Sequence, residues 1–183
     1  MDPKDTDAFN LYVTETLNKL RLRLGIGHYG EDRAIYKSPL YIGDGESRSV
    51  HLGIDLFVPA GTAIFSPLDG IVHSFQDNNN FLDYGPTLIL EHKLNGVIFY
   101  TLYGHLNRAS LKRLNVGQQT TAGEIIASVG RQHENGSWPP HLHFQIITDL
   151  LGYKGDFPGV ARPSEKEYYL KLCPDPNLLL HLK

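Results

Sequence analysis

The chain has 183 residues, 41% hydrophobic and 20% charged, with a formal net charge of -3, which is typical of one globular domain and excludes a disordered chain. Its charges are mixed and its apolar runs are short, which excludes a basic nucleic-acid surface and a transmembrane segment. Its single cysteine, Cys173, excludes an internal disulfide and a thiolate zinc site, so any transition metal must be bound by carboxylates and the nine histidines.

The first segment has the period of an amphipathic helix. Asp5 or Thr6 can cap its start, and Gly25 is placed to end it. We expect this helix to pack on the main body, followed by an irregular stretch over residues 27–46. The apolar residues of its inner face recur at spacings of three and four, at Phe9, Val13, Leu17, Leu20 and Leu24.

From Val50 onward the apolar period changes to two, as in β-strands. Asn95-Gly96 lies between two apolar runs and is a strong hairpin signal. Several short strands at such intervals predict a mainly β fold, built as an antiparallel sheet, barrel or sandwich. Beyond Leu150 the chain looks like a wrapping tail or linker, with a helical candidate over residues 164–172. The expected strands cover residues 50–58, 62–66, 70–75, 87–92, 97–103, 124–129 and 142–148.

Two pairs of polar residues interrupt otherwise apolar strands. His51 and Asp55 are four residues apart and therefore point to the same face of a strand, with Gly53 between them leaving space. His141 and His143 share a face in the same way. If the two pairs meet across a sheet, three imidazoles and a carboxylate surround one small volume.

These residues suit a hydrolytic zinc site, which needs three protein ligands and an open position. His51, Asp55 and one histidine of the 141/143 pair would supply the ligands, and spacing alone leaves open which one. The remaining imidazole and His105, at the end of another strand, could move a proton or stabilise an oxyanion. The other histidines are expected on the surface or in packing, with His133 best placed to line a cleft: His28, His73, His92, His133 and His181.

Four motifs in order resemble the M23 family of zinc metallopeptidases, the lysostaphin-type or LytM-like endopeptidases. They are the run from His51 to Asp55 with residues 59–72, Tyr103-Gly104-His105, residues 116–126, and Pro140-His141-Leu142-His143. The resemblance implies a compact antiparallel β core over residues 48–150, preceded by a helix and lead-in over 1–47 and followed by the tail over 151–183.

The resemblance also implies the roles of single residues. His51, Asp55 and His143 match the family's Zn2+ ligands, and His105 and His141 match its two catalytic histidines. The expected substrate is a peptide bond in peptidoglycan cross-links or in glycine-containing peptides. Gln145 departs from the family pattern, which commonly has an acidic residue there.

Other readings remain open at this point. The start of the chain lacks the apolar core of a signal peptide, so it would be cytoplasmic as given, or a mature periplasmic or extracellular fragment. The domain could be fused to others in a larger enzyme and hydrolyse a different amide, or be a silent binding or regulatory module. A cupin-type metal barrel would also use a His-x-His pair but normally needs a glutamate shortly after it.

Overall fold

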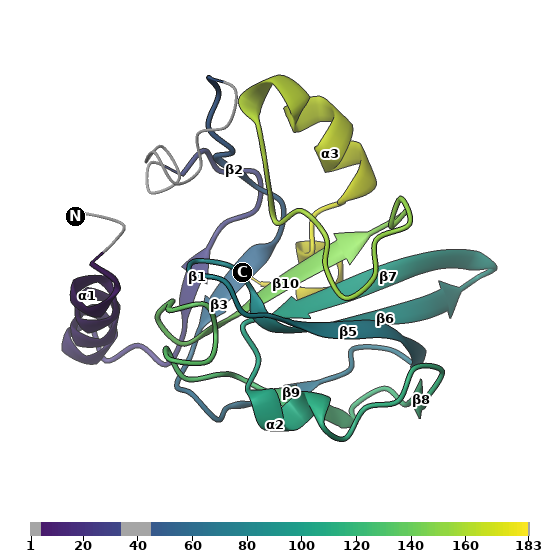
Figure 1. Ribbon diagram of the computed structural model, residues 1–183, viewed down its shortest axis with the longest axis horizontal. Helices are drawn as coiled ribbons and strands as arrows, with labels where there is room; N and C mark the ends of the chain where they lie inside the picture. The colour runs from purple at the N-terminus through teal and green to yellow at the C-terminus, as the bar shows by residue number, and fades with distance from the viewer. Residues whose placement is uncertain (1–4, 34–44, 183) are drawn as a thin grey trace.

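The computed structural model describes residues 5–33 and 45–182. Its centre is a seven-stranded sheet in the order β1-β3-β10-β7-β6-β5-β8, in which all neighbours are antiparallel (Figure 1). The mainly β, antiparallel prediction is therefore confirmed. The strands of this sheet are β1 (Gly25–Gly27), β3 (Ile54–Phe57), β5 (Gly70–Asn78), β6 (Gly85–Leu94), β7 (Val97–Gly104), β8 (Gln119–Thr120) and β10 (His141–Ile147).

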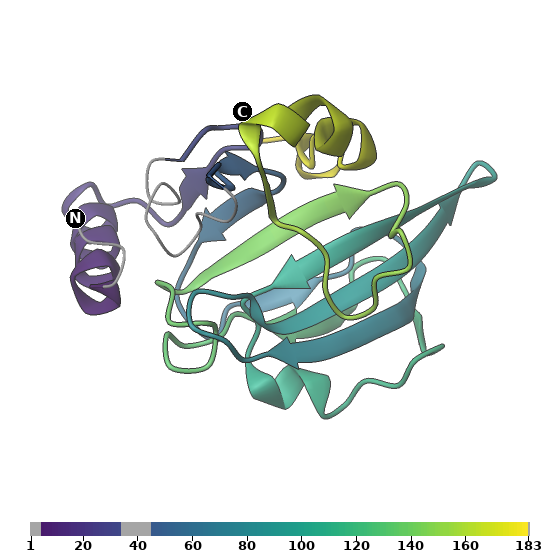
Figure 2. The same ribbon diagram turned by 45° about the horizontal axis from the view of Figure 1, so that its top comes forward.

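Two small sheets and short helices cover the two faces of the central sheet. The strands β4 (Ala63–Phe65) and β9 (Ile125–Ser128) pair with each other, as do β2 (Val50–His51) and β11 (Val160–Ala161). Helix α2 (Arg108–Leu111) lies beside β9 on one side of the sheet, and α3 (Lys166–Leu172) lies on the other (Figures 1 and 2). A 3-10 turn (Pro163–Glu165) leads into α3, and α4 (Asn177–Leu180) ends the described chain.

The alternation of side chains along β6 divides the core into two parts. Leu88 and Leu90 pack with residues of β4 and β9, whereas Ile89 between them packs with Phe157 and Cys173 from the C-terminal segment. At the end of β6, Asn95 (φ 51°) and Gly96 (φ 84°) form the predicted two-residue turn into β7. Among residues 5–33 and 45–182, no helix is long and apolar enough to cross a membrane.

Helix α1 (Thr6–Lys19) begins as expected but ends earlier than Gly25. Asp5 caps its start by accepting a hydrogen bond from the amide of Ala8. Arg21 adopts φ 54°, and the amide of Leu22 donates to the carbonyl of Leu17, a C-terminal motif usually built on glycine. The expected end was therefore wrong, and Gly25 instead begins β1.

The predicted strand over residues 50–58 is broken into β2 and β3, with Leu52 and Gly53 between them. The break occurs because β2 pairs with β11, whereas β3 lies between β1 and β10 in the central sheet. A strand from the N-terminal part of the chain, β1, thus pairs with β3, and a strand from the C-terminal part, β11, pairs with β2. The three-part division at residues 47 and 150 stays a prediction, and part of the expected irregular lead-in, residues 34–44, lies outside the described residues.

Two loops are locked together at one end of the central sheet. The amide of Leu82 donates to the carbonyl of Gly136 at 2.8 Å. Gly136 has φ 85°, and a Cβ there would lie 1.9 Å from the carbonyl oxygen of Asp83. Only glycine satisfies both the backbone angle and this close approach.

We predict that Gly136→Ala lowers the free energy of unfolding more than Gly123→Ala. Gly123 has a similar φ of 81° but open space around it, so its variant should show only the left-handed backbone cost of about 1–2 kcal/mol. Gly136→Ala must in addition move the backbone of the facing loop. Urea denaturation of both variants measures the difference, and equal losses would contradict the packing argument.

Candidate metal centre

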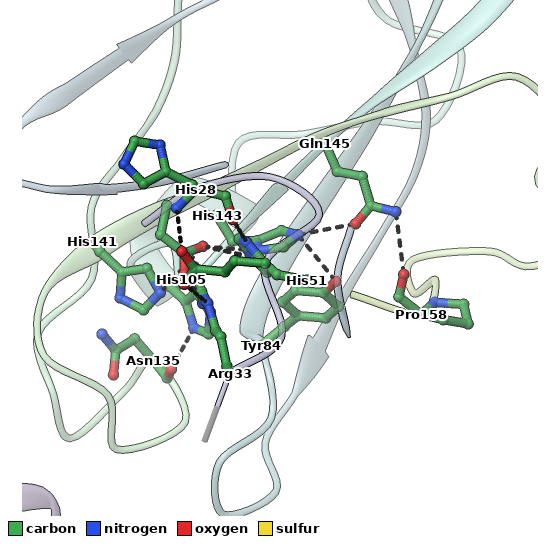
Figure 3. Close-up of polar contacts among 12 residues, drawn as sticks. His28, Arg33, His51, Tyr84, His105, Asn135, His141, His143, Gln145 and Pro158 are labelled. Carbon is green, nitrogen blue, oxygen red and sulfur yellow. Dashed lines mark hydrogen bonds and ion pairs between the residues drawn. The ribbon is translucent and has the colours of Figure 1, made fainter. Parts of the chain in front are cut away.

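Three buried side chains from β2, β3 and β10 converge on one point. Two of them, His51 and His143, are labelled in Figure 3 together with His105 and His141. Asp55 of β3 and His143 of β10 are directly paired across the antiparallel ladder, and His51 of β2 joins them. The Nδ1 atom of His143 lies 2.9 Å from Oδ1 of Asp55, and Nε2 of His51 lies 3.2 Å from the same oxygen. The two imidazole nitrogens are 3.1 Å apart.

This donor set fits a zinc ion. Two imidazole nitrogens and a carboxylate oxygen are the ligand types that zinc prefers. With metal–ligand bonds of about 2.0–2.1 Å, tetrahedral ligands lie roughly 3.3–3.4 Å apart, close to the separations found here. All three residues are buried, with exposures of 1% for His51 and 3% for Asp55 and His143. Any cation bound here would be largely withdrawn from water.

The far side of each imidazole is held by a fixed partner. Nδ1 of His51 donates to the carbonyl oxygen of His28 at 2.9 Å, which leaves Nε2 as the free acceptor. Nε2 of His143 lies 2.9 Å from Oε1 of Gln145, which leaves Nδ1 to face Asp55 and His51. The Gln145 amide donates in turn to the carbonyl of Pro158 and to the sulfur of Cys173, so its oxygen faces His143.

Gly53 makes room for one of these rings. A Cβ at this position would lie 2.7 Å from two ring atoms of His143 and from the carbonyl oxygen of Phe144. The space that the sequence pattern places beside His51 and Asp55 is therefore filled by an imidazole from the other pair.

Asp55 is ionised in this setting. Burial by itself would raise its pKa, but His51, Arg33 and His141 around it, with the contact to His143, hold the pKa well below its usual range. The Arg33 guanidinium contacts the second carboxylate oxygen, with Nη1 2.5 Å from Oδ2. The carboxylate thus stays available as an anionic ligand.

His105 and His141 lie next to this cluster as a second pair of imidazoles, with ring centroids 4.1 Å apart. Nδ1 of His105 donates to the carbonyl of Asn135 at 2.9 Å, and Nδ1 of His141 donates to the carbonyl of Pro139 at 2.7 Å. Because a carbonyl only accepts, each neutral ring carries its proton on Nδ1 and presents a bare Nε2. Nε2 of His141 lies 3.9 Å from Oδ1 of Asp55.

Both rings of this second pair are neutral. Burial lowers the pKa of His141 to about 4, despite the opposing effect of Asp55. Burial and the neighbouring His141 lower the pKa of His105 well below its usual range. His105 also has a left-handed backbone (φ 60°), held by hydrogen bonds from its amide to Tyr84 and from Gly130 to its carbonyl.

A cleft of about 360 Å³ opens onto the cluster. It exposes the three convergent donors and His105 to one space, and aromatic and charged side chains form its walls. The hydroxyl of Tyr84 lies 3.3 Å from Nε2 of His143. The cleft is also lined by Trp138, Asp83, Asp156 and Arg48.

Among the remaining histidines, His28 reaches the cluster through its backbone carbonyl, and the side chains of the others do not line the cleft. His92 is buried and bonded to Thr101 and to the carbonyl of Asp69, as expected of a packing residue, and His133 is exposed and does not line the cleft. Sequence patterns did not single out Arg33 or Tyr84, because neither lies in a strand motif with the donors. Nor did they reveal the His28 carbonyl, since any residue could supply it.

A family model described as "Peptidase family M23" matches residues 49–154. The chain is 30% identical over 107 residues to the L-Ala--D-Glu endopeptidase of Bacillus subtilis, covering 56% of this chain and 31% of that protein. It is 26% identical over 120 residues to the peptidoglycan DD-endopeptidase ShyA of Vibrio cholerae, covering 64% and 25%. The chain thus spans about a third or less of the length of these curated relatives.

Among solved structures, the catalytic domain of the antimicrobial peptidase lysostaphin from Staphylococcus simulans aligns with a TM-score of 0.49 at 24% identity. The alignment covers 85% of this chain and 96% of that domain.

We predict about one Zn2+ per chain in protein purified without chelator, because three anionic or neutral donors already converge on one point. His143→Ala should weaken zinc binding by more than the 10- to 100-fold that the loss of an outer partner typically costs. His133→Ala is the matched control, since it removes an exposed imidazole outside the cleft. Elemental analysis and competition with a chelator measure both, and equal affinities in the two variants would argue against the cluster.

Proposed function

The chain belongs to peptidase family M23, and we propose that it is a zinc-dependent endopeptidase that hydrolyses peptide bonds. The observation that carries this proposal is the convergence of His51, Asp55 and His143 in a cleft that is also lined by the neutral imidazole of His105, with the neutral ring of His141 next to His105. A ligand cluster alone would fit a structural metal site. The unprotonated Nε2 atoms of His105 and His141 next to the cluster add the proton acceptors that hydrolysis requires.

In this proposal His51, Asp55 and His143 would hold the metal, and with three protein ligands the site would remain open to water. When bound in such an open site, zinc supplies a nucleophile at neutral pH and acts as a Lewis acid. The three side chains are held by the His28 carbonyl, by Arg33 and by Gln145, so the donor atoms need little rearrangement. The burial of the cluster also strengthens every charge interaction within it.

His141 and His105 are proposed to handle the proton. The bare Nε2 of His141 can accept a proton from the attacking water, which turns the ring into an imidazolium with donors on both nitrogens. Since Nε2 of neutral His105 is also bare, a donor to the oxyanion or to the leaving amine arises only after one ring has been protonated. Because the two ring centroids are only 4.1 Å apart, a proton on one imidazole disfavours a proton on the other.

Peptidoglycan is the substrate class that we propose. Two relatives are named as endopeptidases of the L-Ala–D-Glu bond and of peptidoglycan, and each shares only the domain-sized part of its length with this chain. The aromatic rings of Tyr84 and Trp138 line the cleft and can contact a bound peptide. Bonds in cross-links and bonds next to glycine are the two candidates to assay.

We predict that His141→Ala keeps the metal and loses about 100- to 10,000-fold in hydrolysis, the usual contribution of a general base. Asp55→Ala should lose both the metal and the activity. The control is His73→Ala, which removes a partly buried imidazole of β5 bonded to Ser74 and should leave both unchanged. Zinc content and the release of fragments from purified cell walls and glycine-containing peptides are measured together.

Two outcomes would count against these roles. Metal loss in His141→Ala with retention in His143→Ala would exchange the two assignments. A wild-type protein that contains zinc yet cleaves neither cell walls nor peptides would indicate another amide substrate or a binding role.

A further inference from the structure

A cation from the N-terminal segment reaches the carboxylate of the candidate metal centre. Arg33 lies 22 residues before Asp55, outside the span matched by the family model, which begins at residue 49. Its Nη1 atom contacts Oδ2 of Asp55 at 2.5 Å, and the side chain is only 12% exposed. A surface arginine that met the carboxylate by chance would not be buried to this extent.

The fold leaves a space for this guanidinium. Strand β1 pairs with β3 so that Gly27 lies opposite Asp55. A Cβ on Gly27 would lie 2.4 Å from Nη2 of Arg33 and 3.2 Å from Cβ of Asp55. The absence of a side chain at this one position of β1 therefore permits the approach.

Two further hydrogen bonds fix the side chain and the backbone of Arg33. Nε of Arg33 donates to Oε1 of Glu31 at 2.6 Å, and the Arg33 amide donates to the carbonyl of Ser49 at 2.9 Å. Glu31 of the lead-in and Ser49, which directly precedes β2, thus set the direction of the side chain. Such a fork of planar donors suits a carboxylate better than the single ammonium of lysine.

The two oxygens of Asp55 have separate partners. Oδ2 faces Arg33, whereas Oδ1 faces the imidazoles, at 2.9 Å from His143, 3.2 Å from His51 and 3.9 Å from His141. The carboxylate cannot rotate without breaking the contact with Arg33. If Arg33 competed with a metal for the same oxygen, it would instead lie on the side of the imidazoles.

We propose that Arg33 is a positioning residue of the metal centre, which holds Asp55 with Oδ1 directed at the ion; this inference rests on the proposed function. The lead-in segment then forms part of the site. The direction in which zinc affinity changes when Arg33 is replaced distinguishes a positioning role from simple charge repulsion. A nearby positive charge repels Zn2+, so removal of that charge alone would tighten zinc binding. Loss of the positioning weakens it.

The test compares zinc affinity, by chelator competition, in the full chain and in Arg33→Met. We expect a loss of about 10- to 100-fold, the typical effect of removing an outer partner of a metal ligand. The zinc affinity of Arg33→Lys should lie between the two, and Glu31→Gln, which weakens the contact with Nε by removing the negative charge, should show a smaller loss. Arg108→Met is the control, because Arg108 forms its ion pair with Asp77 on the surface, at 40% exposure.

A second readout distinguishes positioning from general destabilisation. Addition of guanidinium ion to Arg33→Ala should restore part of the zinc affinity, which it would not do if the variant had lost its fold. Folding of each variant is followed by circular dichroism. If Arg33→Met does not fold, the zinc affinity of Glu31→Gln is compared with that of the wild-type chain instead.

The outcomes separate the two proposals. Tight zinc binding by the wild-type chain, with equal or tighter binding by Arg33→Met, would overturn the role of Arg33 and leave the proposed function standing. Absence of zinc binding by the wild-type chain would overturn the proposed function and this inference with it.

Discussion

The pairing of β3 with β10 is the constraint on which the rest of the site depends. It places Asp55 opposite His143, and a shift of the register by one residue would turn one of these side chains to the other face of the sheet. The apolar face of β10 resists that shift, since Leu142 and Phe144 pack into one part of the core. The register of a buried ladder thus sets the separation of two donor atoms to 2.9 Å without either residue lying in a loop.

Around this ladder the partners come from widely separated parts of the chain. The N-terminal segment supplies the His28 carbonyl and Arg33, and the C-terminal segment supplies the Pro158 carbonyl and Cys173, which orient Gln145. Cys173 has a buried thiol whose pKa burial raises to about 12, so it serves here as a neutral packing and hydrogen-bonding group. An amide at position 145 needs these two acceptors, because its orientation decides whether oxygen or nitrogen faces His143.

Much of the fold could be predicted from local pattern. A period of two identifies strands and tells which residues share a face, and Asn95-Gly96 has few alternatives to a tight turn. The same periodicity brought His51 together with Asp55 and His141 with His143 as pairs. It could not predict the break between β2 and β3, which depends on the remote strand β11, nor the early end of α1, where Arg21 adopts a conformation that its type rarely favours. The contact between Arg33 and Asp55 depends on the pairing of β1 with β3, and the spacing of residues along the chain does not predict this contact.

His51 and His143 are 92 positions apart, and their nitrogens approach only when the central sheet is complete. An ion held by such a set binds the native state and has little affinity for the unfolded chain, so folding and metal occupancy are thermodynamically linked. A free concentration 100 times the dissociation constant adds about 2.7 kcal/mol to the stability of the native state. The melting temperature of this domain would then be a property of its surroundings as much as of its sequence, rising and falling with the supply of the ion.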